Sequence, residues 1–368
     1  MRIALITADF APNIGGVASH VVELGKALAD LGEEVHVITR PLGEMRERHR
    51  HWQGMQVHRP AIPSGKPIYS WLLGAWLKRF YHRHKPDILH VHGLRPLEAS
   101  RNQPAPVIFT NHTSGYLKRI AKGERARQEM GRRLQHVAHV LAPSQELCDA
   151  TRAAGYAGPV DFISNGVDTS RFTPGPTNLR AELGITADEV VVLLARRLVE
   201  KNGVCVFAEA VAALKGLPVR LLFAGDGSEQ NKVESILKKN GMHENSLFMG
   251  AVPNTQMPGV YRLADLSALP SFMEATSITG LESMASGLPL VGTRVGGIPA
   301  LIVENETGLL VEPGDPATLG QALHTLVENP DQRQSMGIAA RQRAVDHFAW
   351  SHIAVLTRDI YRQHLNSG

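Results

Sequence analysis

The sequence of 368 residues is poor in cysteine and has no long hydrophobic run. Its two cysteines, Cys148 and Cys205, have no motif spacing, which indicates a reducing compartment and argues against a structural metal site. No apolar stretch approaches the roughly 20 residues of a membrane-spanning helix. No small-residue cleavage site follows an apolar core at the N-terminus, so we expect no signal peptide. These absences predict a cytoplasmic protein.

Composition and charge indicate a two-domain globular protein. The hydrophobic share of 43% and the charged share of 20% are ordinary for such proteins, and the length suits two cores. Residues 1–170 contain 22 Lys and Arg against 15 Asp and Glu, whereas the remainder contains 17 against 20. A basic first half (+7) beside an acidic second half (−3) favours an anionic partner for the first half. The alternative is the uneven division of charge that two-domain enzymes often have.

The N-terminal half alternates strand and helix patterns. Strands are predicted over 2–7, 34–39, 87–92 and 107–110, and a helix over 17–31. The turn Gly15-Gly16 opens this helix, and two adjacent glycines let the backbone approach a ligand closely. The pattern indicates the βαβ unit of a nucleotide-binding domain, but it lacks the G-x-G-x-x-G spacing of a dinucleotide site.

Histidines follow two of these predicted strands, in His90-Val-His92 and in Asn111-His112-Thr113. Ligands of parallel sheets gather beyond the carboxyl ends of strands, so both clusters are expected near Gly15-Gly16. The alternative is that each histidine is an ordinary core or surface residue. His-x-His is also a metal-ligand spacing, but no further ligand is expected nearby, and the sequence predicts no metal.

Two helical segments combine apolar and basic residues, over 68–84 and 117–139. Helices of this kind lie on anionic membrane surfaces. The alternative is amphipathic helices packed on the sheet with a solvated basic face.

The Pro- and Gly-rich run at 159–176 marks the domain boundary. After it, strands are predicted over 190–195, 219–224, 247–249, 263–269 and 288–291, with a helix over 204–214. Arg196 and Lys201 follow the first of these strands, and Gly225 follows the second. Such paired cations suit a phosphate leaving group. The amphipathic segment 348–361 is predicted to pack back across the other domain.

The segment 270–297 contains the strongest site signal. A helix is predicted over 278–286, with Glu274 before it and Glu282 about two turns inside it. The amides near Ser277, Ile278 and Thr279 are expected to bind a diphosphate, because a helix N-terminus attracts anions. The Glu282 carboxylate is suited to two sugar hydroxyls. The alternative is an ordinary strand–helix unit with two solvated carboxylates.

Together these residues resemble the retaining nucleotide-sugar glycosyltransferases of family 4, over essentially the whole chain. The motifs that carry the resemblance are Glu274-x7-Glu282, Asn165-Gly-Val-Asp168, Gly225-Asp-Gly227, Gly296-Gly297, and the cations Arg196 and Lys201. The chain departs from the family pattern at Ala275-Thr276-Ser277, where Gly-Phe-Gly is usual, and at Ala195, where glycine is usual.

The resemblance implies the GT-B fold, an α/β architecture of two doubly wound Rossmann-like domains facing across a cleft. Residues 1–165 would form the acceptor-binding domain, residues 166–349 the donor-binding domain, and helix 350–368 would pack on the first. It further implies catalytic roles for His112, Glu274, Arg196 and Lys201. The implied donor-binding residues are Gly15, Gly16, Arg196, Lys201, Gly225, Val252, Glu274, Ser277, Ile278, Thr279 and Glu282.

In the implied chemistry, Arg196, Lys201 and helix amides stabilise the departing diphosphate, so that no metal or cofactor is needed. Glu282 would hold the ribose, Glu274 and His112 the transferred sugar, and Val252 the nucleobase. A uridine-diphosphate sugar is the expected donor and guanosine-diphosphate mannose the second choice. The acceptor would be a glycan or a lipid-linked sugar of a surface polysaccharide, lipopolysaccharide or glycolipid, at the inner face of the plasma membrane, and no nucleic acid is expected.

Two other functions stay open from the sequence. One is a non-catalytic protein that binds a nucleotide sugar or a glycan on the same fold. The other is a nicotinamide oxidoreductase, which the doubly wound halves allow but no fingerprint supports.

Overall fold

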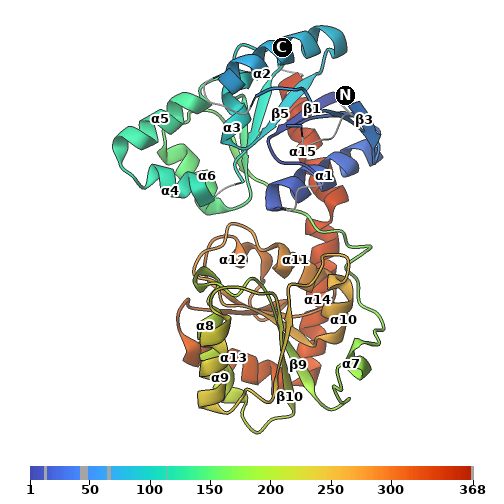
Figure 1. Cartoon of the computed structure of the whole chain (residues 1–368), viewed down its shortest axis with the longest axis vertical. Coiled ribbons are helices and arrows are strands. Elements are labelled where there is room, and N and C mark those ends of the chain that lie inside the picture. The colour runs from blue at the N-terminus through green and yellow to red at the C-terminus, as the bar shows by residue number, and fades with distance from the viewer. Residues whose placement is uncertain (12–14, 42–48, 64–67, 113, 366–368) are drawn as a thin grey trace. The chain divides into compact units, whose positions relative to one another are not determined.

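Two separate sheets organise the chain in the computed structural model, which describes residues 1–11, 15–41, 49–63, 68–112 and 114–365 (Figure 1). Met1–Gly166 together with Trp350–Gly368 forms an N-terminal unit, and Val167–Ala349 forms a C-terminal unit. The division predicted at 165/166 lies one residue from this one. The predicted Thr113 and the last three residues of helix 350–368 lie outside the described residues.

The N-terminal unit contains an eight-stranded sheet in the order β3-β4-β2-β1-β5-β6-β7-β8. All neighbouring pairs are parallel except β3 with β4. The strands are β1 (Arg2–Thr7), β2 (Glu34–Ile38), β3 (His49–Trp52), β4 (Met55–His58), β5 (Ile88–His92), β6 (Val107–Thr110), β7 (His139–Ala142) and β8 (Val160–Phe162).

Helices cover this sheet because their apolar faces need burial. On α1 (Gly16–Asp30) the side chains of Val21, Leu24 and Leu28 are buried, and the C-terminal helix α15 (Trp350–Leu365) lies beside it (Figure 1). Tyr361 of α15 is fully buried in the same core. The other helices are α2 (Ile68–His84), α3 (Leu94–Leu97), α4 (Ser114–Ile120), α5 (Glu124–Leu134) and α6 (Gln145–Ala153).

The single helical segment predicted over 117–139 is wrong. The chain forms α4 and α5 with a break between them, because Gly123 adopts a φ of 118°, which a helix does not contain. Residue 139 already belongs to strand β7.

The C-terminal unit contains a six-stranded parallel sheet in the order β11-β10-β9-β12-β13-β14. The order reverses between β9 and β12, and this reversal is where such sheets bind ligands. The strands are β9 (Val190–Ala195), β10 (Val219–Ala224), β11 (Ser246–Gly250), β12 (Leu266–Leu269), β13 (Leu290–Thr293) and β14 (Gly308–Val311).

Two buried cores cover the two faces of this sheet. Helices α8, α9 and α13 lie on one face, and α10, α11 and α14 on the other (Figure 1). The helices of this unit are α7 (Leu179–Glu182), α8 (Val204–Ala210), α9 (Gln230–Asn240), α10 (Met257–Leu263), α11 (Ile278–Ala285), α12 (Ile298–Leu301), α13 (Pro316–Glu328) and α14 (Pro330–Phe348).

The strand predicted over Leu263–Leu269 begins three residues too early. Leu263 ends helix α10, and the strand β12 begins at Leu266. The predicted fold of two Rossmann-like parallel-sheet domains is confirmed.

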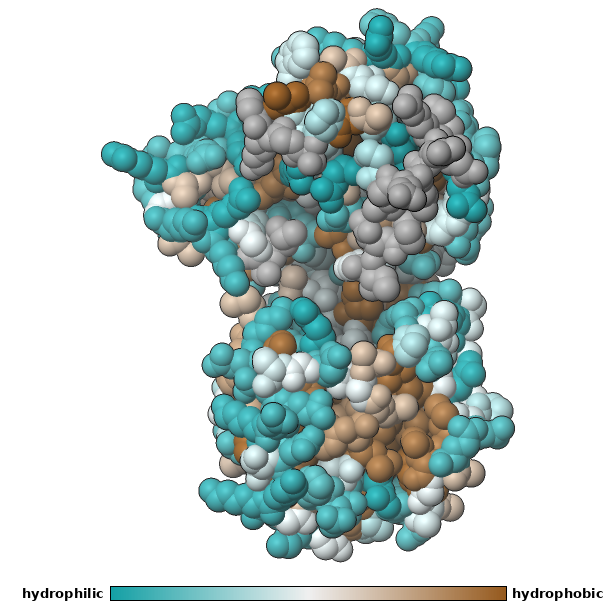
Figure 2. Space-filling view, in the orientation of Figure 1, coloured by the Kyte–Doolittle hydropathy of each residue, from teal (hydrophilic) through white to brown (hydrophobic). Residues whose placement is uncertain are grey.

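Among the described residues, no helix is both long enough and apolar enough to cross a membrane. The basic helix α2 exposes two large hydrophobic side chains, with Ile68 56% and Trp71 73% exposed. Figure 2 shows a largely hydrophilic face on which hydrophobic residues gather in limited areas. Contact with an anionic membrane surface therefore stays a prediction.

Candidate functional site

The candidate residues fall into two groups, one in each unit, and each group lies at the carboxyl edge of its own sheet. In the C-terminal unit the centre of the group is Arg196, which directly follows β9. Its guanidinium donates to the Ser271 hydroxyl and forms an ion pair with Glu274, both of which follow β12. The side chains of Arg196 and Glu274 are only 7% and 18% exposed. Residues 78 positions apart in the chain are thus joined where the strand order reverses.

This ion pair was not expected from the sequence, which assigned Arg196 to a diphosphate and Glu274 to a sugar. The pair neutralises the arginine charge in the ligand-free protein. A phosphate that approaches this edge therefore competes with a carboxylate for the guanidinium.

Lys201 lies in the short 3-10 turn Glu200–Asn202 (η2) that follows Arg196 and Arg197. Its side chain is exposed, and among the described carboxylates none lies within 4 Å of its ammonium. Asn202 stabilises the turn by donating to the Arg197 carbonyl at 2.8 Å. Lys201 is therefore a cation that can meet an anionic ligand without breaking an existing pair.

Gly225 has a structural role that the sequence did not indicate. Its φ is 147°, and a Cβ there would lie 2.0 Å from the Arg196 carbonyl oxygen. Gly227 meets the Leu198 carbonyl in the same way, at 2.2 Å. These glycines allow the loop that contains Gly225 and Gly227 to pack directly on the backbone of Arg196 and Leu198. Gly225 therefore helps to fix the position of the Arg196 backbone.

Gly296 and Gly297 support Glu274 in a similar manner. A Cβ on Gly296 would lie 1.5 Å from the Glu274 carbonyl oxygen, and one on Gly297 would lie 2.3 Å from that of Ala275. The Gly297 amide donates to the Glu274 carbonyl at 3.3 Å. The glycine pair thus fixes the backbone that carries the first glutamate of the motif.

Helix α11 begins as predicted, with Ser277 as its N-cap. The Ser277 hydroxyl accepts from the Gly280 amide at 3.1 Å. The amides of Ile278 and Thr279 belong to the first helical turn, which has no intrahelical acceptors. They lie at the same edge of the sheet as Arg196.

Glu282 is buried one turn further along α11, with 6% of its surface exposed. The Tyr261 hydroxyl of α10 donates to its carboxylate at 2.8 Å. Burial raises the pKa of Glu282 from its usual 4.5 to about 7, although the Tyr261 hydrogen bond opposes the shift. Val252, the candidate for the nucleobase, lies after β11 and is partly buried against the core of the same sheet face.

In the N-terminal unit, Gly16 begins α1 and Gly15 is its N-cap. A Cβ on either residue would meet no atom of the described chain within 4 Å. Neither glycine adopts the left-handed conformation that favours this residue type, since the φ of Gly15 is an extended 167° and Gly16 is helical. The described part of the fold therefore gives no packing reason for glycine at these two positions.

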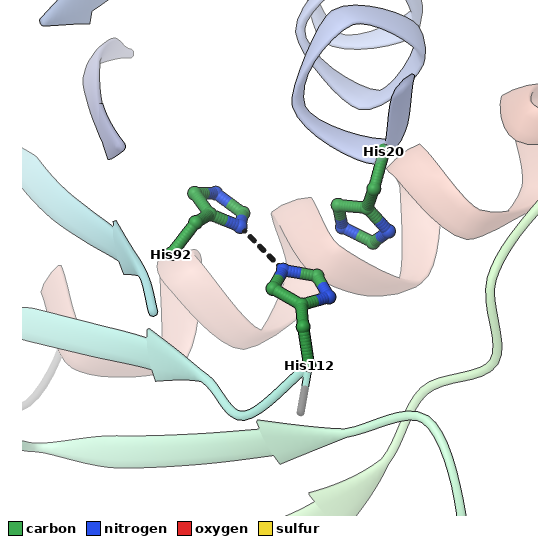
Figure 3. A group of neighbouring side chains, drawn as sticks. All are labelled: His20, His92 and His112. Carbon is green, nitrogen blue, oxygen red and sulfur yellow. Dashed lines mark hydrogen bonds between the residues drawn. The ribbon is translucent and has the colours of Figure 1, made fainter. Parts of the chain in front are cut away.

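The structure brings His112 together with two other histidines (Figure 3). Nδ1 of His92, at the end of β5, lies 2.9 Å from Nε2 of His112, which follows β6. The centroid of the His20 ring, on α1, lies 4.4 Å from the centroid of the His112 ring. Nδ1 of His20 contacts Oδ1 of Asn165 at 2.8 Å, in the segment that leads to the domain boundary.

His90 lies beside this group but has a different set of partners. Its ring nitrogens contact the Tyr361 hydroxyl and the Thr110 hydroxyl, each at 2.6 Å. It therefore joins β5 and β6 to helix α15.

Burial lowers the pKa of these histidines. The pKa of His20 falls to about 4, because desolvation outweighs the hydrogen bond that His20 donates to Asn165. The pKa values of His90, His92 and His112 lie well below their usual 6.5 for the same reason, with neighbouring imidazoles adding to the effect. The rings are therefore neutral at neutral pH and act as hydrogen-bonding groups rather than cations.

Sequence reasoning missed His20 and Tyr261. Each lies on a helix, at a position where its residue type suggests only core packing, and no motif marks either one. The expectation that the strand-end histidines have no further metal ligand nearby is wrong, because α1 supplies His20.

Two family models match adjoining segments of the chain. The model described as Glycosyltransferase Family 4 matches residues 14–171, and that described as Glycosyl transferases group 1 matches residues 176–343. The D-inositol 3-phosphate glycosyltransferase of Arthrobacter sp. (strain FB24) is 29% identical over 404 residues, which cover 98% of this chain and 94% of that protein. The protein of the same name from Frankia alni is also 29% identical, over 96% of this chain and 95% of that protein.

Solved structures show the same fold. The sucrose-phosphate synthase of Thermosynechococcus elongatus superimposes with a TM-score of 0.83 at 24% identity, over 100% of this chain and 99% of that one. HepE of Anabaena, in complex with UDP, has a TM-score of 0.80 at 20% identity, over 99% and 100% of the two chains. A further structure of HepE contains UDP-glucose.

Proposed function

This chain belongs to the family 4 glycosyltransferases of the GT-B fold, and on that premise we propose that it moves a sugar from a nucleoside-diphosphate sugar to an acceptor hydroxyl. In this proposal the transferred sugar is a hexose, its anomeric configuration is retained, and no metal ion takes part in the transfer.

One observation carries the proposal: cationic and amide donors converge at the carboxyl edge of the C-terminal sheet. Arg196 follows β9, Lys201 lies in the next turn, and α11 directs its first amides to the same edge. A diphosphate placed there would meet positive charge from protein groups alone. This arrangement supports leaving-group stabilisation without a metal.

The chemistry follows from where charge develops. As the bond between the sugar and the diphosphate breaks, negative charge grows on the phosphate oxygens, and preorganised donors lower that barrier most. Glu282 would accept hydrogen bonds from the ribose, Glu274 would orient the sugar, and His112 would contact its hydroxyls. The acceptor hydroxyl would attack the face from which the diphosphate departs, which gives retention.

Uridine is the proposed base of the donor. Support comes from HepE, whose structures contain UDP and UDP-glucose. Val252, at the end of β11, is the proposed contact of the nucleobase. Guanosine-diphosphate mannose is the second donor to test.

The acceptor proposal is broader. The named relatives act on D-inositol 3-phosphate, a small phosphorylated polyol, and these names give no support to the expectation of surface-glycan synthesis. We propose a hydroxyl acceptor that carries a negative charge, which the excess of basic residues in 1–170 favours.

A donor and acceptor screen tests this function. The protein is incubated with UDP-, GDP- and ADP-sugars and with inositol phosphates, free sugars and lipid-linked sugars, and products are identified by mass spectrometry. Lys201→Ala and Glu282→Ala should lower turnover strongly, whereas Lys232→Ala, which removes an exposed lysine of α9, should not. No transfer, no hydrolysis and no nucleotide binding with any donor would refute the proposal, and wild-type rates from both site variants would refute the residue assignment.

A further inference from the structure

The cluster of His20, His92 and His112 is formed by three separate segments of the N-terminal unit (Figure 3). The residues come from α1, from the end of β5 and from the loop after β6. One ring nitrogen from each lies within 4.8 Å of the other two. We propose that this cluster binds a divalent transition-metal ion, with Zn²⁺ as the reference ion, outside the chemistry of sugar transfer.

The geometry is close to that of a three-histidine site. Zn²⁺ binds imidazole nitrogen at 2.0–2.1 Å, so the nitrogens of a tetrahedral site lie about 3.4 Å apart. Nδ1 of His92 and Nε2 of His112 are already 2.9 Å apart. The ligand nitrogen of His20 lies within 4.8 Å of the other two, so side-chain adjustments would be needed to bring the three to this spacing.

The hydrogen bond of His20 orients its ring for this role. Its Nδ1 donates to Oδ1 of Asn165 at 2.8 Å, which leaves the lone pair on Nε2. In Figure 3 this second nitrogen faces the rings of His92 and His112. Metal-binding histidines usually have such a partner on the nitrogen that does not bind the ion.

His92 presents its Nδ1 to the cluster, 2.9 Å from Nε2 of His112, and its side chain is 1% exposed. Its ring also lies beside those of His90 and His20, with ring centroids 4.1 Å and 5.5 Å apart. Its Nε2, the nitrogen away from His112, has no hydrogen-bond partner among the residues described, and an ion bound at Nδ1 would not supply one.

The donor set determines the kind of ion. Three imidazole nitrogens suit Zn²⁺, Co²⁺, Ni²⁺ or Cu²⁺, and the cluster offers no carboxylate oxygen for Mg²⁺ or Ca²⁺. His112 is the partly exposed member, so solvent reaches the cluster on its side and water can complete the coordination.

Cobalt titration of the full-length, untagged protein tests the site. After treatment with a chelator, Co²⁺ should bind with one ion per chain and give the visible absorption of a tetrahedral complex, which Zn²⁺ then abolishes. The ring of Trp350 lies 5.2 Å from that of His20, so bound Co²⁺ should also quench tryptophan fluorescence.

Three variants make the test specific. His20→Gln and His92→Gln should each weaken Co²⁺ binding about tenfold or more, since each removes one of three ligands. His324→Gln, which removes a half-exposed histidine of α13, should bind Co²⁺ as the wild type does. Circular dichroism establishes that each variant is folded. No binding at a tenfold excess of Co²⁺, or unchanged binding in folded His20→Gln and His92→Gln, would overturn the site.

The consequence for turnover rests on the proposed function, because it needs His112 to contact the transferred sugar. An ion held by His112 would withdraw that contact, so Zn²⁺ should inhibit transfer and a chelator should restore it. His20→Gln should be less sensitive to Zn²⁺. Co²⁺ binding without transfer activity would leave the metal site intact and refute the function, whereas transfer without Co²⁺ binding would do the reverse.

Discussion

Replacing Glu282 by glutamine should change the stability of the C-terminal unit in a pH-dependent way. Glu282 is 6% exposed, and burial raises its pKa from 4.5 to about 7. Below pH 4.5 the group is protonated in the folded and unfolded states alike. Between pH 4.5 and 7 the folded state binds more protons than the unfolded state, so stability falls as pH rises. Above pH 7 the full cost is present, about 3 kcal/mol.

Glutamine at position 282 does not ionise, so the free energy of unfolding of the Glu282→Gln variant does not fall in this way as the pH rises. Relative to the wild type, it should gain about 2–3 kcal/mol between pH 5 and pH 8. Burying an amide has its own cost, but that cost is the same at both pH values. The change with pH therefore isolates the carboxylate.

Urea unfolding followed by hydrogen exchange of C-terminal peptides measures this difference. Tryptophan fluorescence is an internal control, because Trp52, Trp71, Trp76 and Trp350 all lie in the N-terminal unit. Glu244→Gln, at a side chain that is 97% exposed, is the matched variant and should show no such gain. A Glu282→Gln profile parallel to that of the wild type at both pH values would refute the raised pKa.

The same pKa predicts how a donor binds. If the ribose hydroxyls donate to the Glu282 carboxylate, only the ionised form binds, and affinity for UDP-glucose should fall about tenfold from pH 8 to pH 6. UDP-glucose suits the measurement because both of its phosphates are esterified and do not titrate in this range. Calorimetry should find this slope in the wild type and not in Glu282→Gln. Equal slopes would remove Glu282 from the donor site.

Three further substitutions separate packing from ligand binding. Gly16→Ala should leave the melting temperature within about 2 °C of the wild type, because no described atom lies within 4 Å of the new Cβ. It should lower turnover about tenfold, because the methyl group would meet a donor phosphate that approaches this turn. Unchanged kinetics would contradict this. Gly296→Ala should destabilise the C-terminal unit by about 3 kcal/mol or more, because the new Cβ would overlap the Glu274 carbonyl and the φ of residue 296 is positive. A thermal unfolding curve equal to that of the wild type would show the prediction to be wrong. Arg341→Met should lower the free energy of unfolding in urea by about 2 kcal/mol or more, because the Arg341 guanidinium donates to three backbone carbonyls. An unchanged urea midpoint would mean that water replaces those hydrogen bonds.

Many of the buried strands were predictable because each is a short, continuous apolar run, whereas β4, β7 and β14 were missed. Val107–Thr110, Val190–Ala195 and Val219–Ala224 are the predicted strands to the residue. The edge strand β3, which contains His49–Trp52, lacks such a run and was missed. The start of the strand predicted over 263–269 was also wrong, because the end of helix α10, a short connection and strand β12 share one hydrophobic stretch.

The candidate site could be predicted in its residue types but not in its pairings. Adjacent strand ends identify Arg196 and Glu274 as neighbours, yet an ion pair depends on rotamers and on how closely two loops approach. That approach is set by Gly225 and Gly296, whose missing Cβ atoms admit the opposing backbones. The histidine cluster required His20, which a helical pattern alone marks as a core residue.

The two glutamates of the motif now have different physical environments. Glu274 faces the guanidinium of Arg196, so its negative charge is already compensated. Glu282 accepts from the neutral hydroxyl of Tyr261, and burial raises its pKa more than Tyr261, Arg171 and Asn254 lower it. A carboxylate of the second kind gains most from additional hydroxyl donors, because each one replaces water that burial removed. A carboxylate of the first kind gains least, and it has to release the arginine before that arginine can meet a phosphate. In the proposed function, Glu282 is therefore the better partner for the ribose hydroxyls, and a diphosphate bound at Arg196 would compete with Glu274 for the guanidinium.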